Sequence, residues 1–246
     1  MPLRAVIFDV DGTLADTEQT GHRVAFNGAF AAAGLHWHWD EATYVDLLKV
    51  TGGKERIRHY ARHVDPGFLA RPDAGAVIAA VHADKTARYV GLIEQGRVPL
   101  RPGVADLLID LRGAGIRLAI ATTTTPANVT ALLTTTLGPT GERWFEVVGA
   151  GDVVPAKKPA PDIYEWVLAR MQLSPRDAMA VEDSAVGVAA AHTAGLATIA
   201  TPCGHTRAED FTQAVATVPD LLGIGAADLR EWYAAASPTR QTITQA

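Results

Sequence analysis

The sequence predicts an α/β fold, a Rossmann-like parallel sheet core with helices on both faces and an inserted α-helical cap domain. Three features indicate it. Short apolar runs recur along the chain, helix-length Ala-rich segments separate them, and one long stretch shows helical periodicity instead of strand patterns. A run that is apolar throughout is typical of a parallel strand buried on both faces. Regular alternation of such strands with helices favours a single parallel sheet.

The first strand is expected at residues 4–8, where large β-forming side chains end at Asp9. Similar apolar runs predict four more strands, at 116–121, 145–149, 178–181 and 196–201. Helices are expected at 103–114, from Pro126 onward, and at 184–194, which is closed by Gly195. Polar residues follow several strands, and ligands of parallel sheets bind at the carboxyl ends of the strands.

The stretch from residue 17 to residue 93 contains turn breakers and helical periodicity but no convincing strand run. We therefore expect residues 17–93 to form the cap domain, and residues 1–16 and 94–246 to form the catalytic core. Trp37 and Trp39 are expected to pack inside the cap rather than to stack on a ligand. The sequence after about residue 237 is polar, and we expect it to fray.

Composition narrows the classes of function. The 246 residues include 22 Lys and Arg against 27 Asp and Glu, a formal charge of −5, which is too mild for a nucleic-acid-binding protein. The sequence has no apolar stretch long enough to span a membrane and no signal peptide, so we expect a cytoplasmic protein. The single Cys203 excludes an intramolecular disulfide framework and a multi-Cys zinc site. Dinucleotide and P-loop glycine motifs are missing.

The segment Asp9-Val10-Asp11-Gly12-Thr13 follows the first strand. Two carboxylates two residues apart can converge where the chain turns, as Gly12 permits. Two negative charges at such a short distance repel each other, so the pair requires a cation or a shared proton. Carboxylate oxygens favour Mg²⁺ as that cation. A solvated Asp-Gly turn is the alternative interpretation.

Three further segments add polar groups at predicted strand ends. Thr122 could offer a phosphate oxygen its hydroxyl and its backbone N–H, or it could belong to a turn before a helix. Lys158 precedes Pro159, which fits the first position of a helix and biases the lysine toward extended backbone. A surface lysine is the alternative there. Glu182 and Asp183 end another strand, where acids also favour a helix N-terminus.

In this order, the segments resemble the four motifs of the haloacid dehalogenase superfamily, and the helical insertion looks like that superfamily's type-one cap. Within it, three segments look closest to the CbbY group: 52–56, 121–124 and 158–164. Enzymes of that group are phosphatases that act on xylulose 1,5-bisphosphate and are relatives of β-phosphoglucomutase. The resemblance therefore implies a Mg²⁺-dependent sugar phosphatase that forms an aspartyl phosphate.

The resemblance also implies roles for single residues. Asp9 would be the nucleophile and Asp11 the general acid and base. The metal ligands would be Asp9, the Asp11 backbone carbonyl and Asp183, with Glu182 acting through a water or as an outer group. Groups that bind the phosphate would be Thr122, Thr123 and Lys158.

The cap is expected to select the substrate. From the resemblance and from charge, the substrate-binding candidates are Thr17, His22, Gly53, Lys54, Arg56 and Lys85, with Asn128 from the core. The cations would bind the second phosphate of a bisphosphate. Exposed charges on a helical domain are the alternative, and Asn128 could equally face solvent. His22 lies one position further from the first motif than the mutase pattern places its histidine.

Two functions of the same fold stay open as alternatives, a phosphosugar mutase of the β-phosphoglucomutase type and a phosphoglycolate phosphatase. Thr13 stands where the mutase tends to have valine, which favours hydrolysis. A phosphoacceptor module of another class would not explain the helical insertion. The expected partner is a small-molecule phosphosugar, with no nucleic acid and no membrane, and the chain is expected to be a monomer.

Overall fold

The computed structural model describes residues 2–236, apart from the side chains of Gln19 and Thr20. The predicted polar tail after residue 237 lies outside the described residues. Among the described helices, none is long and apolar enough to cross a membrane.

The fold is built on a six-stranded sheet in the order β3-β2-β1-β4-β5-β6, and all paired strands are parallel. The strands are β1 (Ala5–Phe8), β2 (Arg117–Ala121), β3 (Phe145–Gly149), β4 (Ala178–Glu182), β5 (Ala197–Ala200) and β6 (Ala216–Thr217). The five predicted strands are confirmed to within one residue at each end. β6 was not predicted, because its two residues form no apolar run.

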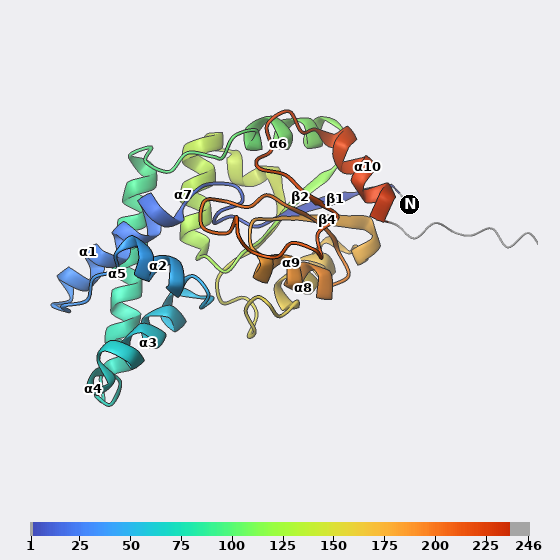
Figure 1. The fold of residues 1–246 in the computed structure, drawn as a ribbon. Helices are drawn as coiled ribbons and strands as arrows, with labels where there is room; N and C mark the ends of the chain where they lie inside the picture. The colour runs from blue at the N-terminus through green and yellow to red at the C-terminus, as the bar shows by residue number, and fades with distance from the viewer. Residues whose placement is uncertain (1, 237–246) are drawn as a thin grey trace, which may run out of the picture.

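Helices cover both faces of the sheet (Figure 1), which confirms the predicted fold class. Alternate strand residues point to opposite faces. The larger ones, such as Phe8 and Ile120, pack against α6 (Val104–Gly113), α7 (Pro126–Leu137) and α10 (Ala226–Ala236). The smaller ones, such as Ala5 and Ala119, pack against α8 (Asp162–Met171) and α9 (Ala185–Thr193). Short 3₁₀ turns at Gly141–Trp144 and Pro175–Asp177 precede β3 and β4.

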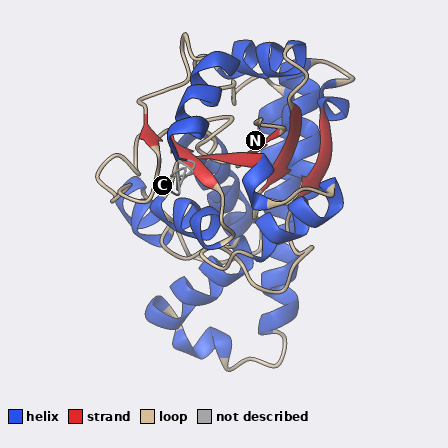
Figure 2. Cartoon of the chain, turned by 90° about the vertical axis from the view of Figure 1, so that its right-hand side faces the viewer, coloured by secondary structure: helices blue, strands red, loops and turns tan. Residues whose placement is uncertain are grey.

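The segment between β1 and α6 is helical and extends to one side of the sheet (Figures 1 and 2). It starts with a π-helical turn at Glu18–His22 and continues with α1 (Arg23–Ala32), α2 (Glu41–Leu47), α3 (Gly53–Val64), α4 (Pro66–Leu69) and α5 (Ala74–Glu94). We call residues 18–94 the helical insertion.

The helical insertion has a hydrophobic cluster of its own, separate from the two clusters on the sheet. The ring of Trp39 is fully buried there, with its centroid 4.6 Å from that of Phe26 and 4.8 Å from that of Phe30. The ring of Trp37 lies 4.9 Å from that of Phe68 in the same cluster. Packing of both tryptophans inside this segment is therefore confirmed. That residues 17–93 form a separate cap domain stays a prediction.

Candidate active site

The candidate site lies where three neighbouring parallel strands end. β1 pairs with both β2 and β4, with Phe8 level with Ile120 and Val181. One residue further on, Asp9 therefore stands beside the ends of β2 and β4. Thr122 follows β2, and Glu182 is the last residue of β4. A cavity of about 660 Å³ opens at this end of the sheet, and residues of the helical insertion line its other wall.

Lys158 connects the strand ends. Its buried ammonium donates hydrogen bonds to Asp9 Oδ1 at 2.7 Å, to Glu182 Oε1 at 2.5 Å and to the Ala121 carbonyl at 2.9 Å. Burial lowers the pKa of Lys158, but the charges of Asp9 and Glu182 outweigh it and raise that pKa overall, so the side chain is an ammonium. Lys158 is therefore a buried residue of the site, and the alternative interpretation as a surface lysine is wrong.

The prediction for Pro159 is wrong. α8 begins at Asp162, after the cap residue Pro161, so Pro159 lies in the preceding loop and not at the first position of a helix. The Lys158–Pro159 peptide bond is cis. Lys158 reaches the site from this loop, because its long side chain spans the distance to Asp9.

The carboxylates beside Lys158 form an electronegative cluster. One oxygen each of Asp9, Glu182 and Asp183 lie within 4.8 Å of one another, and all three residues are buried. Burial raises the pKa of Asp9 to about 7 although Lys158 opposes the shift. Burial, followed by Cys203 and Asp9, raises the pKa of Asp183 well above its usual range. One lysine does not balance these charges, and an oxygen-only donor set of this kind fits Mg²⁺.

Glu182 is turned toward Lys158. Its Oε1 also accepts a hydrogen bond from the Tyr164 hydroxyl at 2.5 Å, and only 1% of the residue is exposed. Gly187 makes room for it, since a Cβ there would lie 2.1 Å from the carboxyl group. Lys158 thus contacts Asp9 and Glu182, whereas no ion pair to Asp183 is seen among the described residues.

Two groups hold Asp11, and a third group supports one of them. Its Oδ1 accepts a hydrogen bond from Thr17 at 2.7 Å and lies 2.9 Å from His22 Nε2, while His22 Nδ1 lies 2.9 Å from Lys85 Nζ. Burial raises the pKa of Asp11, but His22 and Thr17 lower that pKa by a larger amount, so the net shift is downward. Asp11 is therefore an ionised carboxylate in this arrangement.

The π-helical turn explains how His22 reaches Asp11. The His22 N–H donates to the Thr17 carbonyl at 2.8 Å, a five-residue step instead of the four of an α-helix. The turn thus contains one extra residue. The extra residue compensates for the position of His22, which lies one residue further from the first motif than the mutase pattern places its histidine. Thr17 contacts Asp11 and is not among the described residues that line the cavity.

The threonine run after β2 lines the core side of the cavity. The Thr122 N–H donates to the Gly149 carbonyl at 2.9 Å, so the expectation that it is free for a phosphate is wrong. This bond continues the ladder between β2 and β3 by one residue. The Thr122 hydroxyl accepts a bond from the Thr124 N–H at 3.3 Å and, like Thr123, lines the cavity.

Asn128 is buried rather than solvent-facing. Its amide nitrogen donates to Thr124 Oγ1 at 2.8 Å, whereas its carbonyl Oδ1 has no hydrogen-bond partner among the described residues. The residue lines the cavity. A buried acceptor without a donor is costly, so this oxygen suits a ligand hydroxyl.

The opposite wall contains the predicted cap residues His22, Gly53, Lys54, Arg56 and Lys85. Lys54 Nζ lies 2.8 Å from Asp152 Oδ2 in the loop after β3. The buried Arg56 guanidinium donates to the Tyr44 hydroxyl at 3.1 Å and to the Val50 carbonyl at 3.3 Å. Burial lowers the pKa of Lys85 to about 8, although Asp11 opposes the shift.

Sequence reasoning missed Glu18 of this wall and Tyr44, which contacts it. Glu18 is buried, lines the cavity and accepts a hydrogen bond from the Tyr44 hydroxyl, which in turn contacts Arg56. Glu18 stands between the singled-out positions Thr17 and His22, and that proximity was the available signal. Nothing local in the sequence links Tyr44, 26 positions further on, to this group.

The chain is similar to proteins of one known family. A model of haloacid dehalogenase-like hydrolases matches residues 3–195. Protein CbbY of Rhodobacter capsulatus is 48% identical over 221 residues, which cover 90% of this chain and 95% of that protein. A CBBY-like protein of Arabidopsis thaliana is 41% identical over 222 residues, covering 89% of this chain and 69% of that protein.

Solved structures agree. Crystal structures of CbbY from Rhodobacter sphaeroides, one in complex with phosphate and one of a mutant in complex with xylulose-(1,5)bisphosphate, superpose with a TM-score of 0.85 at 45% identity, covering 93% of this chain and 99% of those chains. β-Phosphoglucomutase from Clostridium difficile has a TM-score of 0.77 at 20% identity, over 95% of this chain and 98% of that chain, which is a likeness of fold alone. The predicted resemblance and the predicted enzyme class are thereby confirmed, and the chain belongs to the haloacid dehalogenase-like hydrolases.

Proposed function

We propose that this chain is a Mg²⁺-dependent phosphatase that hydrolyses xylulose 1,5-bisphosphate to xylulose 5-phosphate and phosphate. The main support is the buried Lys158 ammonium between Asp9 and Glu182, on the wall of a cavity that also presents Asp11 and several cations. The sugar bisphosphate bound in the similar CbbY crystal structure supports the choice of substrate. Residues 17–93 are proposed to act as the cap that covers the phosphosugar.

Mg²⁺ would be held by Asp9 and Asp183 and by the Asp11 backbone carbonyl, with Glu182 acting through a water or as an outer group. When bound, it would neutralise part of the charge on the phosphoryl oxygens, so that an anion can approach them. Lys158 and the Thr122 hydroxyl add a positive charge and a hydrogen-bond donor on the core side. Thr123 would contribute to the same phosphate subsite.

In the first step, a carboxylate oxygen of Asp9 forms a bond to phosphorus as the bond between phosphorus and the sugar oxygen breaks, which yields an aspartyl phosphate. Lys158 holds Asp9 in one orientation for this attack. The departing oxygen needs a proton, which Asp11 supplies after gaining one. That proton comes from the water consumed in the second step of the preceding turnover, and the N–H of His22 holds Asp11 in place at 2.9 Å.

In the second step, a water molecule attacks the phosphorus of the aspartyl phosphate and returns Asp9 to its free form. Asp11 then takes the proton from that water. The hydrogen bonds from Thr17 and His22 favour the ionised state that this step requires. In enzymes generally, acid–base catalysis of this kind increases the rate by about 10²–10⁴-fold.

The test is a panel of phosphate esters with Mg²⁺: xylulose 1,5-bisphosphate, xylulose 5-phosphate, β-glucose 1-phosphate and phosphoglycolate. We expect the bisphosphate to have the highest kcat/KM, with phosphate released and no sugar-phosphate isomer formed. Formation of an isomer would favour the mutase. A preference for phosphoglycolate would favour that phosphatase, and either result would contradict the proposal.

Asp9→Asn should abolish phosphate release, because an amide cannot attack phosphorus, while the circular-dichroism spectrum is unchanged. Asp106→Asn is the matched control, since the same change is made at an exposed position of α6. We expect its activity to equal that of the unmodified chain. Phosphate release by the Asp9 variant at the control's rate would remove Asp9 as nucleophile.

A further inference from the structure

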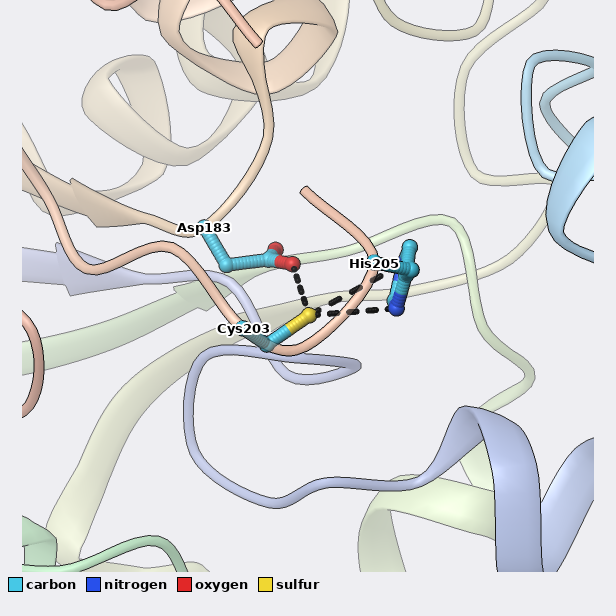
Figure 3. Close-up of side chains that lie close together, drawn as sticks. All are labelled: Asp183, Cys203 and His205. Atoms are coloured by element: carbon cyan, nitrogen blue, oxygen red, sulfur yellow. Dashed lines mark hydrogen bonds between the residues drawn. The ribbon is translucent and has the colours of Figure 1, made fainter. Parts of the chain in front are cut away.

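The loop after β5 brings a thiol and an imidazole to Asp183 (Figure 3). Cys203 Sγ lies 3.1 Å from Asp183 Oδ2, and the two ring nitrogens of His205 lie 3.3 and 3.8 Å from the same sulfur. The thiol and the carboxylate are buried, with 3% of each residue exposed. The proposed phosphatase chemistry uses neither Cys203 nor His205.

We propose that Asp183, Cys203 and His205 form a binding site for Zn²⁺, separate from the Mg²⁺ position between Asp9 and Asp183. One donor atom of each residue lies within 4.8 Å of the other two. In tetrahedral coordination, with Zn–S of about 2.3 Å and Zn–N or Zn–O of about 2.0–2.2 Å, neighbouring ligand atoms are about 3.5 Å apart. The observed 3.1 and 3.3 Å require only small side-chain movements.

The donor set distinguishes this site from the others. Sulfur and imidazole ligands favour zinc over magnesium, whereas Asp9, Glu182 and Asp183 offer oxygen alone. A third group, formed by Asp11, Glu18 and His22, has comparable spacing but contains no sulfur ligand.

The backbone holds the two loop ligands in place. The Cys203 N–H donates to Thr206 Oγ1 at 2.9 Å, and the Thr206 N–H returns a bond to the Cys203 carbonyl at 3.2 Å. This turn keeps Cys203 and His205, two positions apart, on the side of Asp183. His205 and Asp183 both line the cavity, so an ion can reach them from there.

Zinc at this site would compete with magnesium for Asp183. Binding displaces the thiol proton to solvent and places the cation on Asp183 Oδ2, the oxygen that now faces Cys203. The charge of Asp183 would then be shared with zinc, and repulsion between the two cations would weaken magnesium binding beside Asp9. Zinc is therefore expected to inhibit the phosphatase, an effect that rests on the proposed function, whereas the binding itself does not.

Binding is tested on the full chain, without Mg²⁺ and with a phosphine reductant, by titration with Co²⁺ as a spectroscopic substitute. We expect a thiolate-to-cobalt charge-transfer band that saturates at one ion per chain and disappears when Zn²⁺ is added. Cys203→Ser should remove the band, and His205→Ala should weaken cobalt binding by more than about tenfold. His192→Ala, at an exposed position, is the control and should titrate like the unmodified chain. Absence of the band in the unmodified chain would overturn the proposal, and so would unchanged affinity in His205→Ala.

Inhibition is tested at saturating Mg²⁺ with the best ester from the panel. The zinc concentration that halves the rate should rise by more than about tenfold in Cys203→Ser, each variant being compared with its own zinc-free rate. If the same zinc concentration halves the rate of Cys203→Ser and of the unmodified chain, zinc acts at the oxygen ligands, and the proposal is overturned. If no ester is hydrolysed, the proposed function fails, while the cobalt titration still decides the zinc site.

Discussion

At the scale of single residues, Gly12 couples the backbone after β1 to the candidate metal ligands. Its φ of +89° lies in the left-handed region that favours glycine. A Cβ at this position would lie 2.1 Å from Asp183 Oδ2. Gly12 is therefore required twice, once for the turn and once for the close approach of the carboxylate.

Gly12→Ala should lower kcat/KM by more than about 100-fold, because Asp183 must move to admit the methyl group. Steady-state phosphatase kinetics measure this loss, and Mg²⁺ titration should show weaker binding as well. Urea unfolding should show a cost of about 1–2 kcal/mol from the backbone strain.

Gly115→Ala separates strain from the clash. Gly115 also has a positive φ, +72°, but a Cβ there meets nothing within 4 Å. The Gly115→Ala variant should lose about as much stability as Gly12→Ala and keep the kcat/KM of the unmodified chain. If both variants lost activity equally, strain in the chain rather than displacement of Asp183 would be the cause.

At the scale of elements, α5 joins the helical insertion to the cavity and the sheet. Ile78 and Val81 pack in the insertion's own cluster, whereas Tyr89 and Ile93 pack against the sheet. Lys85 stands between them on the same buried stripe. A lysine in the middle of an apolar stripe is stable there because its ammonium faces the cavity and His22.

Lys85 should give bisphosphate binding a pH dependence. Because burial lowers its pKa to about 8, the ammonium is present below that pH and is lost above it. The KM for the bisphosphate, divided by the KM for a monophosphate, should rise about tenfold from pH 7 to pH 9. The ratio cancels effects that both substrates share.

Lys85→Met is the comparison for this pH profile, since it keeps the length of the side chain without the charge. Its KM ratio should be high at pH 7 already and flat up to pH 9. A rising ratio in this variant would assign the pH dependence to another group.

At the scale of the whole molecule, an ion pair spans the cavity. Lys54 belongs to α3 of the helical insertion and Asp152 to the loop after β3, and Lys157 also contacts Asp152 at 2.6 Å. About a third of the Lys54 side chain is exposed, so water screens the pair and its contribution to stability is small. The ammonium can therefore exchange Asp152 for a phosphate at little cost.

Lys54→Ala should lower kcat/KM for the bisphosphate by about 10–100-fold, the range of a lost hydrogen bond between charged groups. The monophosphate should lose much less. Arg71→Ala, in an exposed ion pair with Asp73 that lies outside the cavity lining, is the control and should change neither value. Equal losses for both substrates would place Lys54 away from the second phosphate.

The sequence by itself determined the elements and the chemistry of the first motif. Apolar runs are local signals, and five strands followed from them; β6 did not, because two residues contain no such signal. The spacing of the aspartates after β1 predicted that the pair needs a cation or a shared proton, and the structure places both residues at the cavity. The helical insertion and the packing of its two tryptophans were also visible in local patterns.

The tertiary structure alone decided which groups meet. Lys158 and Asp9 are 149 positions apart, and Lys54 and Asp152 are 98 apart. The order of the strands and the placement of the helical insertion create such contacts, and neither can be deduced from the local sequence. The π-helical turn that brings His22 to Asp11, and the loop that turns Cys203 toward Asp183, depend in the same way on packing against distant segments.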